Sequence, residues 1–280
     1  MRAVILSSQI EEIKSSLDED VFKYISANLT DTYEEHANYS LIAFDWYDTS
    51  IDDHVRPQIL IYLDHEDLFF LCENDKALEF VKKILPPENV EQANDKVLYA
   101  FFRELIKGDF ILLEKFENEI TNKEDTAMEN NDHDGYIIRI TEYRKKLMHL
   151  KHYYEQLVDI IDNIADNDNS LLSDDAIRHF GILESRTERL LHNVINLRDY
   201  VTQMREAFQA QIDIEQNDIM RVFTVLTAVF LPLTLMVGWY GMNFTSMKEI
   251  TWPYSYPVFI AVSILLVVVL IFYFKKKKWF

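Results

Sequence analysis

Cysteine, glycine and proline are all scarce in this chain of 280 residues, which has one cysteine, five glycines and six prolines. The single cysteine, Cys72, excludes an internal disulfide framework and fits a reducing compartment. None of the glycines belongs to a Gly-x-x-x-x-Gly-Lys sequence, which argues against an ATP-driven pump. No proline lies between Ser173 and Pro232, so one continuous helix of roughly 100 Å is allowed from near Ser173 to Tyr240. A helix of that length cannot bury itself in one subunit, which argues for an oligomer or a stalk.

Basic residues are the minority among the charged ones, with 28 against 47 acidic residues and a formal net charge of −19. This balance argues against nucleic acid as a partner and favours cations, but composition alone favours the simpler interpretation of an acidic, well-solvated cytosolic surface. The first sixteen residues lack an apolar core long enough for a signal peptide, so we expect the N-terminus to stay inside the cell. No nucleophile is paired with a base, so no catalytic residue is assigned and the chain is not predicted to be an enzyme.

Charged residues are absent from two long apolar runs, Val222 to Tyr240 and Val258 to Phe274. As helices they would cover roughly 28 Å and roughly 26 Å, close to the roughly 30 Å hydrocarbon core of a bilayer. Four lysines, Lys275 to Lys278, end the second run. Because lysine is retained on the cytoplasmic side, we predict a multi-pass protein of the cell membrane with both termini in the cytoplasm and the intervening loop outside.

The residues before the first run have the pattern of a soluble, mixed α/β domain followed by helices. Strands are predicted over 2–7, 40–46, 58–63 and 68–72, with a hairpin link at 64–67. Helices are predicted over 10–29, 76–85 and 90–119, and again beyond Gly135 after a polar stretch. The chain thus divides into a cytoplasmic α/β domain over 1–120, a helical hairpin and stalk helix over 121–221, and a transmembrane hairpin with a basic tail over 222–280.

Two stripes follow the predicted long helix. Alternating steps of three and four residues give a stripe of mostly small and polar side chains: Gly238, Thr234, Leu231, Thr227, Thr224, Met220, Asn217, Asp213, Ala210 and Glu206. A second stripe is apolar: Leu190, Val194, Leu197, Val201, Met204 and Phe208. The apolar stripe is predicted to pack against protein and the polar stripe to surround water. A lone threonine stripe in a membrane more often packs helices, but the carboxylates and Asn217 on the same face favour a pore.

The segment from Asn217 to Ile250 resembles the signature of the CorA family of magnesium channels and transporters. The matching residues are Met220, Pro232-Leu233-Thr234, Gly238 and Tyr240-Gly241-Met242-Asn243-Phe244. The resemblance implies a funnel-shaped homo-oligomer, a pentamer, with its pore lined by the first span. Pore-lining positions of the family match Asn217, Met220, Leu231, Thr234, Gly238 and Asn243, and the acidic pore ring matches Glu206.

The function expected from this resemblance is a channel or transporter for hydrated Mg²⁺, which would be both the transported ion and a regulatory ligand. The candidate ion-contacting residues are Glu206, Asn217, Met220, Thr227, Leu231, Thr234, Gly238, Gly241, Met242 and Asn243. The partners implied are lipid, divalent cations and further copies of the chain. Two alternatives stay open: a carrier for zinc or another divalent cation of the same superfamily, and a membrane-anchored signalling or scaffolding protein.

Two positions depart from the family pattern. Phe223 stands where a leucine is usual in the constriction, which predicts a bulkier tight point. In the outer loop, Lys248 replaces a common proline beside Glu249. Repeated in each subunit, this lysine would weaken the attraction of the loop for cations. The alternative is that Lys248 points into solvent or toward lipid phosphates and has little effect.

Overall fold

The computed structural model describes residues 1–27, 32–49, 56–85, 92–130, 133–242, 247, 252–277 and 279. They form two compact units, Met1–Arg205 and Glu206–Phe280. The longest helix, α6 (Asp174–Tyr240), begins in the first unit and ends in the second. The continuous helix expected from the scarcity of proline is therefore confirmed, with Pro232 inside it.

Five strands of the first unit form one mixed sheet. They are β1 (Arg2–Leu6), β2 (Tyr33–Glu35), β3 (Tyr39–Asp45), β4 (Gln58–Asp64) and β5 (Leu68–Cys72), in the order β1-β5-β4-β3-β2. The pairing of β1 with β5 is parallel, and the other pairings are antiparallel. The four predicted strands are confirmed within one or two residues, while β2 was not predicted.

The predicted hairpin link between β4 and β5 is built by one aspartate. The Asp64 carboxylate accepts the backbone N–H of Glu66 at 2.7 Å and that of Asp67 at 2.6 Å. The backbone N–H of Asp64 donates to the Asp67 carbonyl at 3.1 Å. Such a side chain satisfies the donors that a tight turn leaves free, which is why aspartate favours this position.

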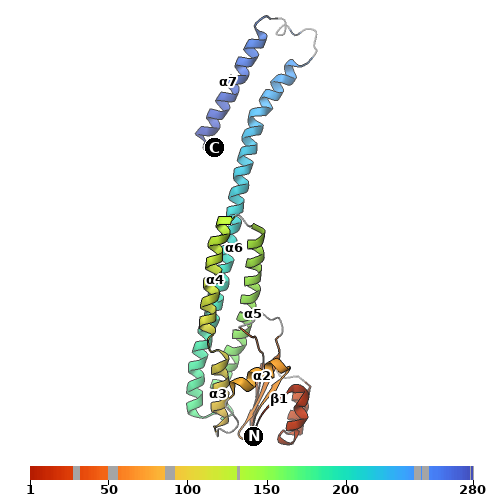
Figure 1. Ribbon diagram of the computed structural model, residues 1–280, viewed down its shortest axis with the longest axis vertical. Coiled ribbons are helices and arrows are strands. Elements are labelled where there is room, and N and C mark those ends of the chain that lie inside the picture. Colours follow the sequence, from red (N-terminus) through yellow and green to blue (C-terminus); the bar gives the residue numbers. More distant parts are fainter. Residues whose placement is uncertain are drawn as a thin grey trace. The chain divides into compact units, whose positions relative to one another are not determined.

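Helices cover both faces of the sheet. A 3₁₀ segment, η1 (Ser7–Ser16), and helix α1 (Glu19–Ser26) bury Ile13, Leu17, Val21 and Ile25 against Leu41, Leu60 and Leu71. Sequence spacing predicts one helix here, but the extended backbone at Leu17 and Asp18 divides it in two. On the other face lie α2 (Asp75–Ile84) and α3 (Asn94–Leu105), as Figure 1 shows.

Aromatic rings form the core on the α3 face. Phe44 of β3 lies 6.3 Å from Phe101 and 6.1 Å from Phe102 between ring centroids, and Phe70 of β5 lies 5.0 Å from Phe101. Successive residues of a strand point to opposite faces of the sheet. Phe44 therefore packs against α3, whereas Leu41 packs in the core on the opposite face, against η1 and α1. This two-sided burial explains why these strands are continuous apolar runs.

Three long helices complete the first unit: α4 (Asp109–Asn130), α5 (His133–Asp166) and the initial part of α6, which lie side by side in Figure 1. The predicted 90–119 helix is in fact two helices, α3 and α4, separated near Gly108, whose φ of 89° ends a regular helix. The polar stretch before Gly135 is largely helical. Five apolar-stripe residues of α6 are buried, which confirms their packing against protein: Leu190, Val194, Leu197, Val201 and Met204.

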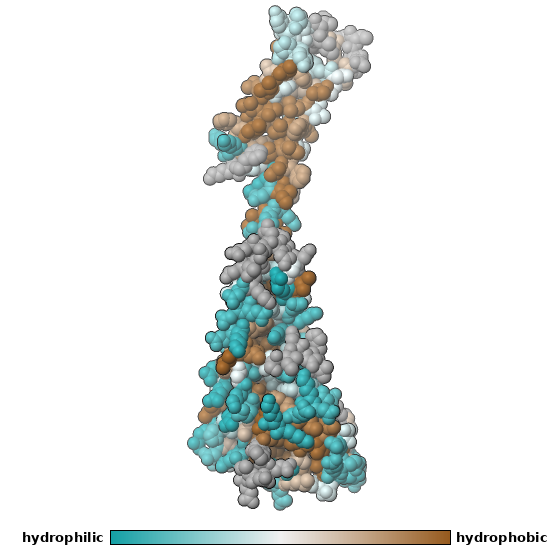
Figure 2. Space-filling view, in the orientation of Figure 1, coloured by the Kyte–Doolittle hydropathy of each residue, from teal (hydrophilic) through white to brown (hydrophobic). Residues whose placement is uncertain are grey.

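The second unit contains the remainder of α6 and helix α7 (Ser255–Lys276). Both helices are long and apolar enough to cross a membrane, and only 6% of the most apolar window in each is buried within the chain. Their exposed surfaces are predominantly hydrophobic (Figure 2). A soluble protein would not leave two such surfaces in water, so they fit a lipid environment.

Candidate ion pathway

The predicted polar stripe is exposed along α6 in the second unit. Glu206, Asn217 and Thr234 are exposed, as are Met220 at 67% and Leu231 at 65%. The side chains with 3–4 spacing therefore share a face that the chain itself does not cover. This face is free to contact other molecules or water.

Three threonines of the stripe have the same hydrogen-bond geometry. Their hydroxyls donate to the backbone carbonyl one turn earlier, at 2.7 Å for Thr224, 2.9 Å for Thr227 and 2.9 Å for Thr234. Each hydroxyl oxygen keeps its lone pairs as acceptors because its hydrogen is already used. The stripe thus presents acceptors without charge, which suits the outward-pointing hydrogens of a hydrated cation.

A groove of about 910 Å³ on the C-terminal part of α6 brings five of the candidate residues together: Thr227, Leu231, Thr234, Gly238 and Met242. Its other walls are large apolar side chains that the sequence reasoning did not assign: Leu226, Phe230, Leu235 and Trp239. Helical spacing could have found Phe230 and Leu235, because they lie three or four residues from stripe positions. Leu226 and Trp239 instead adjoin the stripe residues Thr227 and Gly238 in the sequence. Glu206, Asn217 and Met220 lie before the groove on the same helix.

Two glycines, Gly238 and Gly241, lie near the C-terminal end of α6, and they differ in the space that the chain leaves for a side chain. A Cβ at Gly241 would lie 3.0 Å from the Val237 carbonyl oxygen, which also accepts the Gly241 N–H at 2.8 Å. A Cβ at Gly238 would meet nothing within 4 Å. A side chain at Gly241 would therefore require the Val237 carbonyl to shift by a few tenths of an ångström, whereas one at Gly238 would have space within the chain. Asn243, the third residue of the Gly-Met-Asn tripeptide, lies outside the described residues, as do Lys248 and Glu249.

Ionisable groups of α6 lie before the apolar span and not within it. Glu206 and Asp213 are exposed, and Arg221 pairs with Asp218 at 2.9 Å. Between Val222 and Tyr240 no residue is charged. This face thus has carboxylates on the N-terminal side of the span and neutral groups within the span. Among the residues that the structure describes, no three His, Cys, Asp or Glu side chains gather as a metal site within one chain.

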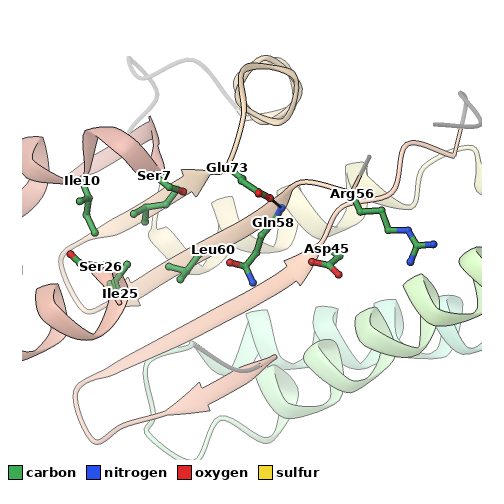
Figure 3. A pocket seen from close by; sticks show the side chains of 10 residues that line it. Ser7, Ile10, Ile25, Ser26, Asp45, Arg56, Gln58, Leu60 and Glu73 are labelled. Atoms are coloured by element: carbon green, nitrogen blue, oxygen red, sulfur yellow. Dashed lines mark hydrogen bonds between the residues drawn. The ribbon is translucent and has the colours of Figure 1, made fainter. Parts of the chain in front are cut away.

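A cavity of about 480 Å³ in the first unit lies over the sheet, where η1 begins and α1 ends (Figure 3). Leu60 and Leu71 line it together with Asp45, Gln58 and Glu73 at the strand ends. The Arg56 side chain points away from the others in Figure 3, and its guanidinium contacts His149 of α5. The polar groups therefore do not converge on one point, and the cavity is not assigned as a site.

A buried carboxylate joins the α/β layer to the long helices of the first unit. Asp109, only 3% exposed, accepts the Tyr154 hydroxyl at 2.8 Å and the Thr49 hydroxyl at 3.1 Å. Burial raises the pKa of Asp109, and the two hydrogen bonds only partly oppose this. Sequence patterns gave no signal for this contact, because Asp109 and Tyr154 are far apart in the chain.

Carboxylates also crowd together between the end of α5 and the start of α6. Burial first, and then the charges of Asp162, Glu188 and Asp166, raise the pKa of Glu184. Neighbouring negative charges disfavour the ionised form of the Glu184 carboxyl group. The acidic excess of the sequence is thus locally concentrated.

These features define a class: a membrane protein with two spanning helices, a soluble α/β unit, and an exposed stripe of neutral acceptors on the first span. The model of the family described as "CorA-like Mg2+ transporter protein" matches residues 7–276. The chain therefore belongs to this family of divalent-cation transporters.

Individual relatives agree with the assignment. The chain is 29% identical over 185 residues to the cobalt/magnesium transport protein CorA of Thermotoga maritima, which covers 66% of this chain and 52% of that protein. It is 25% identical over 266 residues to the magnesium transport protein CorA of Campylobacter jejuni, covering 92% and 80% respectively. The structure of the CorA magnesium transporter from Methanocaldococcus jannaschii matches with a TM-score of 0.77 at 17% identity, over 98% of this chain and 88% of that one. At this identity, the structural match shows the fold alone.

Proposed function

We propose that the chain forms a homo-oligomeric channel that passes hydrated Mg²⁺ down its electrochemical gradient. One observation carries the proposal: on one face of an apolar helix, three exposed threonine hydroxyls, at Thr224, Thr227 and Thr234, offer neutral oxygen acceptors. Copies arranged with this face inward would enclose a polar path within an apolar wall. Family membership supports the same reading.

The chemistry of Mg²⁺ fits such a path. The ion holds six waters at about 2.1 Å and sheds them reluctantly, so a pore that hydrogen-bonds the hydration shell avoids the cost of dehydration. Gly241, Met242 and Asn243 would form the outer mouth, and neutral oxygens there would bind the ion without trapping it. A ring of Glu206 would concentrate cations at the other end. Two charges crossing 100 mV gain roughly 4.6 kcal/mol, which is sufficient as a driving force.

The assembly that we propose is a pentamer in the cell membrane, with both chain termini in the cytoplasm. Residues 1–120 would form the cytoplasmic sensing domain, 121–221 the helical hairpin and stalk, and 222–280 the transmembrane hairpin. Lys275, Lys276 and Lys277 at the end of α7 favour this orientation.

Internal Mg²⁺ would also close the channel. Two features support this: the acidic excess of the sequence, and the raised pKa of Glu184, to which nearby carboxylates contribute after burial. A bound divalent cation would relieve the repulsion among such carboxylates. With Mg²⁺ present, carboxylates of neighbouring subunits would be bridged, and without it they would repel. The soluble part should therefore resist protease better in Mg²⁺ than in chelator, and equal susceptibility would contradict this gating.

The proposed function is tested by ion flux into liposomes that contain the purified full chain. Mg²⁺, Co²⁺ and Zn²⁺ are compared side by side, at an inside-negative potential and at several internal Mg²⁺ concentrations. We expect saturable Mg²⁺ uptake that falls as internal Mg²⁺ rises. No uptake of any divalent ion at any internal Mg²⁺ concentration would favour a signalling or scaffolding protein.

The same assay decides the second candidate, a carrier for another divalent cation of the superfamily. The name of the Thermotoga relative, a cobalt/magnesium transport protein, favours this alternative for Co²⁺. Faster uptake of Co²⁺ or Zn²⁺ than of Mg²⁺ at equal concentration, together with acidification of the lumen, would identify a proton-coupled carrier.

A further inference from the structure

The C-terminal end of α7 combines three cationic and three aromatic side chains within one helical turn and its cap. We call this the α7 basic–aromatic end, and its described members are Tyr273, Phe274, Lys275, Lys276, Lys277 and Trp279. Its lysines directly follow the uncharged run from Val258 to Phe274. In Figure 2 a hydrophilic patch adjoins the hydrophobic surface of α7 at this end.

The way in which α7 ends holds Trp279 next to the last turn of the helix. The Trp279 backbone N–H donates to the Phe274 carbonyl at 3.2 Å, and the two rings lie 5.4 Å apart between centroids. This is the long closing hydrogen bond, with its apolar contact, that is common where α-helices end. Trp279 therefore folds back beside the last turn of α7. Indole rings favour the headgroup level of a bilayer, where one edge is apolar and the other is wet.

The lysines surround the same helix end. Lys275, Lys276 and Lys277 are exposed, and consecutive helical residues point about 100° apart, so the three ammonium groups fan outward. The Lys277 ammonium lies 5.6 Å from the centre of the Tyr273 ring, which holds it close to the span. Across the part of the chain that the structure describes, no carboxylate forms an ion pair with any of them.

We propose that the α7 basic–aromatic end binds the phosphate groups of anionic phospholipids. The cations would lie at the phosphate level, because the apolar span sets their depth and Trp279 marks the interface. Lysines near a membrane surface gain about 1 kcal/mol each from anionic lipid, or roughly fivefold in affinity per lysine. Because the ammonium groups fan outward, they would hold a small shell of lipids around each α7 and not one lipid in a pocket.

Lipid quenching of tryptophan fluorescence in the full-length protein tests the proposal. A chain that keeps only Trp279 (W46F, W239F and W252F) is reconstituted into bilayers that contain brominated phosphatidylglycerol or brominated phosphatidylcholine. We expect Trp279 to prefer phosphatidylglycerol by roughly fivefold or more at low salt. The preference should shrink at 1 M salt, where the Debye length is about 3 Å.

Charge variants identify the groups responsible. Lys275→Gln, Lys276→Gln and Lys277→Gln together should bring the preference close to one, and the corresponding arginine variant should retain it. The matched control removes three exposed lysines of the first unit, Lys82→Gln, Lys83→Gln and Lys115→Gln, and should retain the preference. Equal quenching by both lipids at low salt, or an unchanged preference in the first glutamine variant, overturns the proposal. If that variant instead dissociates the oligomer while its lipid preference is unchanged, the lysines contact another subunit and the proposal is wrong.

Discussion

Replacing Asp109 tests whether its buried hydrogen bonds hold α4 and α5 to the α/β layer. In Asp109→Ala the buried Tyr154 hydroxyl loses its acceptor, and the Thr49 hydroxyl loses its partner. An unsatisfied buried polar group costs about 1–3 kcal/mol, whereas removal of the buried charge returns part of the desolvation cost. We expect a net loss of about 2 kcal/mol, which is roughly a 30-fold increase in local opening.

Asp109→Asn should behave differently, because the amide keeps the shape and an acceptor oxygen for Tyr154. Its stability should lie within about 1 kcal/mol of the native chain. Since the folded-state pKa of Asp109 is raised above 3.8, its stabilising contribution is complete below that value and is lost as the pH rises through the folded-state pKa. The asparagine variant should therefore gain stability relative to the native chain as the pH increases from acid to neutral.

Hydrogen exchange of α4 and α5 peptides in the full-length protein measures both effects, because it reports local opening. Glu117→Ala, an exposed carboxylate on α4, is the control and should change opening by no more than about 0.5 kcal/mol. The reasoning fails if Asp109→Ala opens no more readily than Glu117→Ala. It also fails if the asparagine and alanine variants are equally destabilised at neutral pH.

Two further predictions concern the second unit. Gly241→Ala should disturb the end of α6 and reduce Mg²⁺ flux, whereas Gly238→Ala should leave the secondary structure of the protein unchanged by circular dichroism; the opposite ranking would contradict the 3.0 Å contact at Gly241. A cysteine introduced at Thr245 should react with an impermeant reagent from outside only, and labelling from inside would reverse the proposed orientation. The native Cys72 should not contribute to this labelling, because it is buried and burial raises its pKa to about 12.

The sequence predicts the individual helices and strands of this fold better than it predicts how the strands pair. Val258 to Phe274 and the strands β4 and β5 could be predicted because apolar runs of fixed length have few alternatives. The three-residue strand β2, Tyr-Glu-Glu, carries no alternation, and its pairing with β3 is what orders it. The parallel pairing of β1 with β5, in which Arg2 lies opposite Leu68, likewise could not be predicted from the sequence, because it depends on tertiary contact between distant segments.

The candidate site was partly predictable for the same reason. Thr227 and Thr234 share a face because helical spacing dictates it, and both line the groove on α6. Gly238 and Gly241 differ in the space available for a Cβ atom. This difference depends on the backbone geometry at the end of α6, which the sequence does not predict. The sequence did not indicate that Phe230 and Trp239 line the groove, because large apolar residues in a span are expected to face lipid.

The most direct test of the proposed ion pathway is the Mg²⁺ flux of Asn243→Ala in liposomes, with the oligomeric state measured on the same sample. The proposed pathway predicts that selective Mg²⁺ uptake is lost while the oligomer remains intact, because the amide faces ions and not protein. Gly238→Ala, for which the chain itself leaves space, is reconstituted in parallel to show that a small change in the span does not alone dissociate the oligomer. Native Mg²⁺ uptake by Asn243→Ala together with a dissociated oligomer would make Asn243 a structural residue and contradict the proposed pathway.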